Sequence, residues 1–267
     1  MDFFSKKEKT LQNKFLKNGY LVFNIGKNKD LNEIKKKVIR FSSEWIEKKK
    51  LIKINKSKKS RLLDEIHNYI NQNELNEFRM YVYNKINQNK NFQKSYYNLG
   101  KKYIDMLCGN ELVMQKKCNL SIQMPNDNSS LLPLHADVWV GDSEYELVFW
   151  LPLVDIYKTK AMYILSPEEN EKYSKIFFKF KSMDQIYKRV KKKLKWIKLD
   201  YGQGLLFSQN LMHGNIVNVE KETRWSFNCR FKSILSPYRD KELGNFFRPI
   251  TVRPITILGM NYEFPNS

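Results

Sequence analysis

The distribution of proline constrains the fold of this chain more than any other sequence feature. All eight prolines lie between Pro125 and Pro265, so the first 124 of the 267 residues contain none. Because proline breaks the interior of a helix, the proline-free stretch can be helical over most of its length. The sequence therefore predicts a mainly helical N-terminal part, followed by a part of another kind.

Apolar residues recur at helical spacing in three N-terminal segments. Asp30 and Glu33 have the spacing of a capping box at the start of the first. The lysine-rich run 48–59 separates it from the other two, and we expect that run to be a solvated linker. Ahead of the first segment, the apolar run 19–25 opens with glycine and predicts a strand. The apolar positions are Leu31, Ile34, Val38, Phe41 and Trp45, then Leu62, Leu63, Ile66 and Ile70, then Leu75, Phe78, Val82 and Ile86.

The apolar period changes to two at Cys118, which indicates strands. Short strand-like runs with turn residues between them then follow, the spacing of a β-sandwich or barrel. Ser166 and Ser182 each begin a helix-capping pattern, so we expect two helices inserted at 167–194. This insertion is interpreted as either a solvated surface feature or a lid. The predicted strands are 118–124, 145–153, 161–165, 196–199, 204–207 and 224–231.

Charge and composition limit the classes of partner. The net charge is +20, yet only nine of the 48 basic residues are arginine, the side chain that phosphate and base recognition favours. We therefore expect no nucleic-acid partner, and attribute the lysine excess to coding bias or to an anionic ligand. No apolar stretch is long enough to span a membrane or to form a signal peptide, which predicts a soluble, cytoplasmic protein. Cys108, Cys118 and Cys229 have no metal-ligand spacing and are interpreted as reduced thiols.

Two of the three histidines lie in a pattern that suits a metal. Strand alternation would place His135 and Asp137 on one face, and His213 follows 78 residues later, a separation that a folded sheet can close. Two imidazoles and one carboxylate form the facial triad of non-haem iron(II) oxygenases. His67 lies far from this pattern, in a predicted helix, and is interpreted as structural.

A cationic anchor follows the second histidine. Arg224 comes eleven residues after His213, and alternation places Ser226 on the same strand face. A guanidinium fork suits the distal carboxylate of a dicarboxylate such as 2-oxoglutarate. Arg230 shares that face and remains an alternative anchor.

These motifs together resemble the phytanoyl-CoA dioxygenase family of iron(II)/2-oxoglutarate oxygenases. The resemblance rests on the segments 135–137, 200–207 and 213–218 followed by Arg224, and covers roughly residues 11–235. It is closest to the branch found in sporadic bacterial carbohydrate-biosynthesis clusters. The chain departs from the family at 166–169, where Ser-Pro-Glu-Glu replaces a glycine-containing turn with Ser-His.

The resemblance implies an α+β fold with a double-stranded β-helix core. One domain, 1–267, would comprise a helical support (1–110), a jelly-roll core with the helical insertion 167–194 (111–235) and a C-terminal extension (236–267). The implied site residues are His135, Asp137 and His213 for iron(II), Arg224 and Ser226 for 2-oxoglutarate, and Gln123 and Asn119 lining the cosubstrate pocket.

The resemblance also implies hydroxylation of a small molecule by molecular oxygen. We expect a sugar or sugar-linked anionic substrate, because the aromatic residues Trp139 and Tyr145 follow the metal motif and aromatic rings stack on sugars. The alternatives are a non-catalytic barrel that binds an anionic glycan or nucleic acid, and an oxygenase that acts on another small molecule or on nucleic acid.

Overall fold

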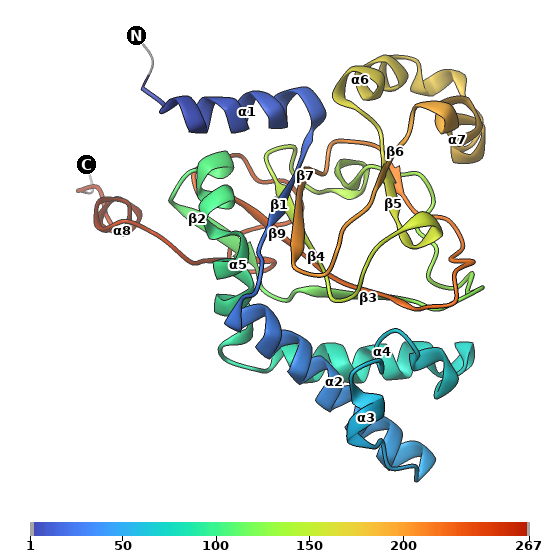
Figure 1. The fold of residues 1–267 in the computed structure, drawn as a ribbon. Helices are drawn as coiled ribbons and strands as arrows, with labels where there is room; N and C mark the ends of the chain where they lie inside the picture. The colour runs from blue at the N-terminus through green and yellow to red at the C-terminus, as the bar shows by residue number, and fades with distance from the viewer. Residues whose placement is uncertain (1–2, 266–267) are drawn as a thin grey trace.

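The helices at 72–87 and 92–108 pack against one face of a large antiparallel sheet, and the helix at 29–50 packs on both of them (Figure 1). The computed structural model describes residues 3–265. The elements up to residue 110 are α1 (Lys6–Asn18), β1 (Tyr20–Asn24), α2 (Lys29–Lys50), α3 (Lys56–Lys59), the 3₁₀ helix η1 (Ile66–Asn68), α4 (Gln72–Asn87) and α5 (Phe92–Cys108).

Helix α2 confirms the first apolar repeat but begins earlier than expected. Its N-cap is Asn28, whose side chain accepts hydrogen bonds from the amides of Asp30 and Leu31, so Asp30 lies in the first turn. Asn28 is a stronger start signal than the expected box because its Oδ1 satisfies amides that the helix itself leaves free. The helix also continues through Lys50, so the predicted linker is partly helical.

The expected helix over residues 62–70 is wrong. This segment consists of turns and η1, although its four apolar side chains are buried. The carbonyl of Leu63 accepts a hydrogen bond from the Trp225 indole, and the carbonyl of Asp64 accepts one from the amide of Thr223. These long-range bonds use acceptors that a helix would need for its own ladder.

The strands form two antiparallel sheets. The larger has the order β1-β7-β4-β9-β2-β10, with β3 also paired to β9, and the smaller has the order β6-β5-β8. The remaining strands are β2 (Leu112–Gln115), β3 (Asn119–Gln123), β4 (Leu147–Pro152), β5 (Met162–Ile164), β6 (Lys195–Ile197), β7 (Gln203–Ser208), β8 (His213–Gly214), β9 (Arg224–Ser233) and β10 (Phe247–Pro249). The short 3₁₀ helices are η2 (Asp137–Val140), η3 (Lys158–Lys160), η4 (Phe177–Lys179) and η5 (Lys191–Lys193).

Strand β9 separates the apolar core from the polar interior. Its apolar side chains face the helices: Trp225 lies edge-on to Phe78 of α4 with ring centroids 5.8 Å apart, and Phe227 lies 5.1 Å from Phe92 of α5. Residues 224, 226, 228 and 230 alternate with these and point to the other side. A polar row therefore faces away from a fully apolar layer.

The predicted insertion contains two helices, α6 (Pro167–Lys175) and α7 (Met183–Val190). Ser166 and Ser182 cap them by accepting hydrogen bonds from the amides of Glu169 and Gln185, as the sequence predicts. Figure 1 shows both helices beside the smaller sheet, where they form a separate apolar cluster with it. The insertion thus lies on the side of the molecule opposite α2 and α4.

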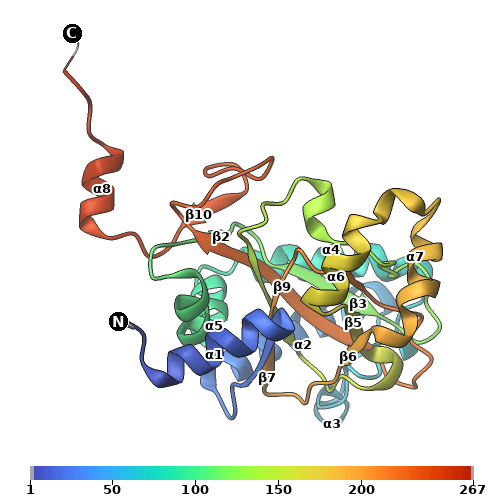
Figure 2. The same cartoon turned by 90° about the horizontal axis from the view of Figure 1, so that it is seen from above.

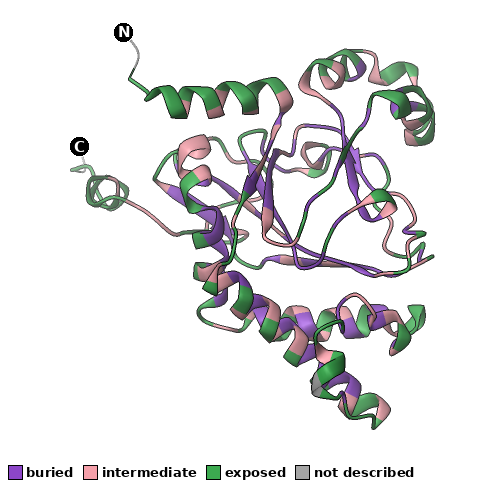
Figure 3. Ribbon diagram, viewed as in Figure 1, coloured by how far each residue is buried: buried purple, intermediate pink, exposed green. Residues whose placement is uncertain are grey.

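The C-terminal segment adds β10 to the larger sheet and then leaves the body of the molecule as α8 (Pro254–Met260). Figure 2 shows α8 standing away from the sheets, and Figure 3 shows it mostly exposed. Within residues 3–265, no helix combines the length and apolarity that crossing a bilayer requires.

Candidate metal and cosubstrate site

His135, Asp137 and His213 meet where the smaller sheet joins the loop after β3. Their ligand atoms all lie within 4.8 Å of one another. The Nε2 atoms of His135 and His213 lie 3.4 Å and 3.9 Å from Oδ1 of Asp137, and the ring centroids are 4.4 Å apart. The 78 residues between the histidines are closed by a β-bridge in which each donates its amide to the other's carbonyl, at 2.9 and 2.8 Å.

Both imidazoles are held in one tautomer by backbone carbonyls. Nδ1 of His135 bonds to the carbonyl of Pro133 at 2.7 Å, and Nδ1 of His213 bonds to that of Leu211 at 2.8 Å. A carbonyl only accepts, so each Nδ1 carries a proton, and in the uncharged imidazole each Nε2 presents a lone pair. This is the arrangement that orients histidine ligands toward a metal.

The protonation states of Asp137 and His213 also suit a metal. Burial lowers the pKa of His213 to about 4. Burial raises the pKa of Asp137, but the hydrogen bond from His135 and the charges of His213 and Arg230 outweigh it and hold that pKa at about 2. Burial lowers the pKa of His135, but its hydrogen bonds with Asp137 and Pro133 exceed that effect and raise it. At neutral pH, Asp137 is a carboxylate and His213 is uncharged.

Strand alternation continued over residues 135–139 would place Trp139 on the same face as His135 and Asp137, but the chain does not stay extended past Ala136. Ala136 is extended, but η2 begins at Asp137, and the Trp139 amide donates to the Ala136 carbonyl at 3.0 Å. Hydrogen bonding of the Asp137 amide to the Gln209 carbonyl, at 3.1 Å, holds the start of this turn. Tertiary contacts therefore position Asp137. Because the chain turns there, strand alternation does not put Trp139 on the same face as the ligands.

Beside the histidines lies a narrow cavity of about 60 Å³. By the same measure one ordered water needs roughly 10–15 Å³, so the cavity has room for a small ligand group. Its lining residues are Ser121, Leu132, His135, Trp150, Met162, Phe207, His213, Gly214, Asn215, Arg224 and Asn228.

Arg224 brings an incompletely bonded guanidinium to this cavity. The side chain is 3% exposed, and Nη2 donates to Oγ of Ser121 at 3.2 Å, while Nε has no partner. Burial without a counter-charge lowers the pKa of Arg224 to about 10. Oγ of the neighbouring Ser226 is also buried and unpartnered, although Ser226 is not among the cavity-lining residues. Unpartnered buried polar atoms of this kind are rare in folded proteins, and Arg224 therefore has donor capacity for a polar ligand.

Gln123 and Asn119 lie on β3, opposite Arg224 and Asn228 of β9. Gln123 is buried, donates from Nε2 to the Ile216 carbonyl at 2.6 Å and leaves Oε1 without a partner. Asn119 accepts from Gln115 at 3.3 Å. Neither side chain lines the cavity. Ser121, which lies between them on the same strand face, does line it.

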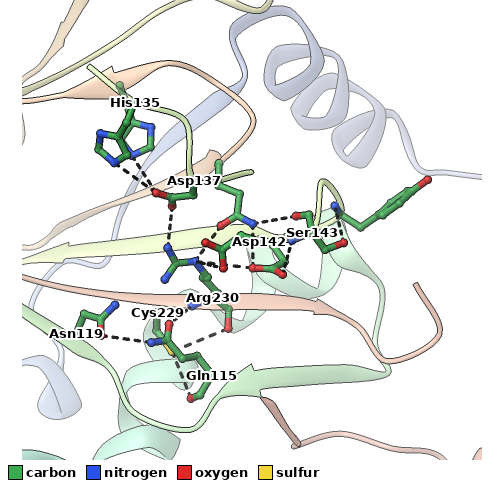
Figure 4. A network of polar contacts seen from close by, with 12 residues as sticks. Gln115, Asn119, His135, Asp137, Asp142, Ser143, Cys229 and Arg230 are labelled. Carbon is green, nitrogen blue, oxygen red and sulfur yellow. Dashed lines mark hydrogen bonds and ion pairs between the residues drawn. The ribbon is translucent and has the colours of Figure 1, made fainter. Parts of the chain in front are cut away.

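Arg230, the alternative anchor, is paired inside the protein (Figure 4). Its Nη2 donates to Oδ2 of Asp137 at 2.9 Å, and its Nε donates to Oε1 of Gln209 at 2.9 Å. Asp142 and Glu146 lie 3.4 and 3.8 Å from the same Nε. Arg230 therefore contacts a candidate metal ligand directly.

The aromatic residues proposed for substrate differ in position. Trp139 is 40% exposed, and its ring meets Phe177 of η4 edge-on at 4.9 Å, so the insertion touches the segment that carries Asp137. Tyr145 is 53% exposed, in the turn before β4. Trp150, on β4, is buried and lines the cavity.

Sequence reasoning missed Gln209, Asp142 and Glu146. Gln209 is fully buried, and its side chain donates to Glu146 at 2.9 Å and to the Ser143 carbonyl at 2.8 Å. Their spacing matches no motif, and a buried position for such polar residues has no local signal. The position of Gln209 four residues before His213 is the sole hint in the sequence.

No known family and no curated protein matches the chain in sequence. Solved structures match in fold. ThoJ, a non-heme monooxygenase in a nickel complex, has 14% identity and a TM-score of 0.52 over 91% of this chain and 84% of its own. EctD from S. alaskensis, with 2-oxoglutarate and 5-hydroxyectoine, has 12% identity and a TM-score of 0.54 over 88% and 78%. AviO1 from Streptomyces viridochromogenes Tue57 has 10% identity and a TM-score of 0.51 over 88% and 99%.

At these identities the similarity concerns the fold. It agrees with the expected α+β class, and two of the matched structures hold a metal or 2-oxoglutarate. The described part of this chain contains a His-Asp-His group that could bind a metal.

Proposed function

We propose that this protein is an iron(II)- and 2-oxoglutarate-dependent oxygenase, built on a double-stranded β-helix and belonging to the phytanoyl-CoA dioxygenase-like group. One observation carries the proposal. The two histidines of the His135-Asp137-His213 cluster line the same cavity as a buried arginine, Arg224, that lacks a full set of partners. A group of metal ligands alone would be compatible with many kinds of metalloprotein. The adjacent Arg224, which has no counter-charge, favours one that also binds an anionic ligand.

The donor set fits iron(II). Two imidazole nitrogens and one carboxylate oxygen lie close together, the composition of the facial triad. The described residues bring no thiolate to the group, so a soft, sulfur-based site is not favoured.

The cavity fits 2-oxoglutarate. A distal carboxylate of the cosubstrate would accept from Nε of Arg224 and from Oγ of Ser226, the two orphaned donors. Ser121 already holds the guanidinium from one side, which restricts its orientation before ligand binds. Trp150, Met162 and Phe207 form apolar walls of this cavity.

The chemistry that bound iron and 2-oxoglutarate supply is oxidation of a substrate by molecular oxygen. The residues of the chain bind and orient the two groups. His135 and His213 present their Nε2 lone pairs, while Asp137 stays ionised through its low pKa. Burial of His213 and Arg224 strengthens their electrostatic contacts, because charges interact more strongly away from bulk water.

We further propose hydroxylation of a sugar or sugar-linked anionic metabolite in a carbohydrate-biosynthesis setting. Exposed Trp139, two residues from Asp137, supports a substrate that stacks on an aromatic ring. The +20 charge supports an anionic substrate. Succinate formation measured with nucleotide-activated sugars, acidic sugars, acyl thioesters, amino acids and single-stranded oligonucleotides tests this assignment, and turnover confined to the last three classes would contradict it.

The oxygenase proposal is tested by anaerobic reconstitution with iron(II) and 2-oxoglutarate. Wild-type protein should bind one iron per chain and develop the metal-to-ligand charge-transfer band of a chelated keto acid. Asp137→Ala and His213→Ala should lose both, because each removes one of three ligands. His67→Gln is the matched control, since His67 bonds to Thr223 outside the ligand group. Wild-type iron content and band in both alanine variants would refute the proposed metal site.

A further inference from the structure

Arg230 contacts the oxygen of Asp137 that faces away from the histidines. Oδ1 of Asp137 lies 3.4 and 3.9 Å from the two imidazole Nε2 atoms, and Oδ2 accepts from Nη2 of Arg230 at 2.9 Å. The two carboxylate oxygens therefore have separate partners. One points into the ligand cluster and the other is bound to a guanidinium.

The guanidinium is itself held from its opposite end. Nε of Arg230 donates to Oε1 of Gln209 and lies within ion-pair distance of Asp142 and Glu146. Gln209 and Glu146 are buried and bonded to each other, and Glu146 also accepts from the amide of Ser143 at 2.9 Å. Figure 4 shows Asp137 and Asp142 beside Arg230. A planar fork fixed at Nε has little freedom at Nη2.

Gln209 links this network to the backbone of the ligand cluster. Its carbonyl accepts the amide of Asp137, while its side chain accepts from Arg230. Asp137 is thus fixed at two points, the amide and Oδ2, by residues that also contact each other. Gln209 lies four residues before His213, in the turn that precedes β8.

We propose that Arg230 is a positioning residue that keeps Asp137 a one-oxygen ligand. The inference rests on the proposed function. A facial triad leaves three coordination positions for a chelating keto acid and oxygen. If Oδ2 were free to turn toward the metal, the carboxylate could occupy a fourth position. Binding Oδ2 to Arg230 prevents this and leaves those positions open.

Cobalt(II) is the probe that tests this role in the full-length protein without turnover. Arg230→Lys keeps the charge but loses the fork, and Arg230→Gln removes the charge. Both should weaken cobalt(II) binding by roughly tenfold to a hundredfold, as loss of an outer partner of a ligand does. At saturating cobalt(II), both should also change the shape and intensity of the d–d absorption, because the carboxylate regains freedom. The lysine variant provides the measurement if the glutamine variant does not fold.

Arg239→Gln is the matched control, because Arg239 makes an exposed ion pair with Glu144 at 3.1 Å beyond the end of the same strand. It should match wild type in both measurements. If wild type binds cobalt(II) while a folded Arg230 variant keeps wild-type affinity and spectrum, the positioning role is overturned and the proposed function stands. If wild type does not bind cobalt(II), the metal site itself is refuted.

Discussion

The two ends of the polar row on β9 carry the same residue in opposite states. Arg224 and Arg230 share one strand face, six residues and roughly 20 Å apart. Arg224 is buried with one hydrogen bond and an unpartnered Nε. Arg230 is bonded to Asp137 and Gln209 and lies beside Asp142 and Glu146. Arg224 therefore has a hydrogen-bond donor left for a ligand, whereas Arg230 makes its hydrogen bonds and ion pairs within the protein.

This difference shows how a buried cation can be assigned either to ligand binding or to stabilising the fold. Burying a charge without a counter-charge costs free energy, so a fold retains such a group when something else gains from it. A ligand-binding role suits Arg224, because the carboxylate of a ligand would complete its hydrogen bonds. A structural role suits Arg230, because it neutralises its acidic partners even when no ligand is bound. Four predictions test this contrast.

The largest expected effect is on the stability of the apoprotein when Arg230 is removed. Arg230→Met should lower the free energy of unfolding by about 3–5 kcal/mol, because it leaves three carboxylates without their cation. Urea denaturation measures this, and Arg239→Met, at an exposed pair, should stay within about 0.5 kcal/mol of wild type. A loss below about 1 kcal/mol at Arg230 would show that the ion-pair cluster does not stabilise the fold.

The next effect is on cosubstrate affinity. Arg224→Met should weaken 2-oxoglutarate binding by about 2–5 kcal/mol, or roughly 30- to 4,000-fold, and leave iron(II) binding near wild type. Anaerobic titration of the charge-transfer band with 2-oxoglutarate measures the first and iron content the second. If Arg230→Lys loses 2-oxoglutarate affinity and Arg224→Met does not, the cosubstrate anchor would be Arg230 and not Arg224.

A smaller effect of opposite sign is expected on the stability of the same Arg224 variant. Arg224→Met removes an unsatisfied buried donor and keeps a long side chain, so the free energy of unfolding of the apoprotein should stay equal or rise by about 1–3 kcal/mol. Urea denaturation without ligands measures it. Destabilisation by more than about 1 kcal/mol would mean that Arg224 supports the fold, and would weaken the contrast with Arg230.

The smallest effect is expected at Ser226. Ser226→Ala should reduce 2-oxoglutarate affinity roughly 2- to 12-fold, the equivalent of one hydrogen bond of about 0.5–1.5 kcal/mol. The apoprotein should be no less stable, because the Oγ atom has no partner to lose. Ser233→Ala, at the far end of β9, is the control, since its Oγ bonds to the Leu235 amide. Unchanged affinity in Ser226→Ala would remove this hydroxyl from the proposed cosubstrate pocket.

Much of the fold could be predicted from local patterns. The repeat from Leu31 to Trp45 is helix α2, the caps at Ser166 and Ser182 begin α6 and α7, and the alternation from Cys118 is strand β3. Each of these depends on hydrogen bonds or burial within a few residues. The segment 62–70 fails for the opposite reason, because its carbonyls bond to Thr223 and Trp225.

The candidate site also has some features that depend on local sequence and others that depend on long-range contacts. The sequence by itself determined which residues to examine: His135, Asp137 and His213, with Arg224 and Arg230 on one strand face, because residue type and alternation are local properties. Only the tertiary structure decided that Arg224 keeps an orphaned donor while Arg230 is paired. The partners of Arg230 come from the loop at 137, the turn at 142–146 and the end of β7, segments that are brought together by folding alone. Which charges are compensated depends on these long-range contacts, and no local pattern encodes them.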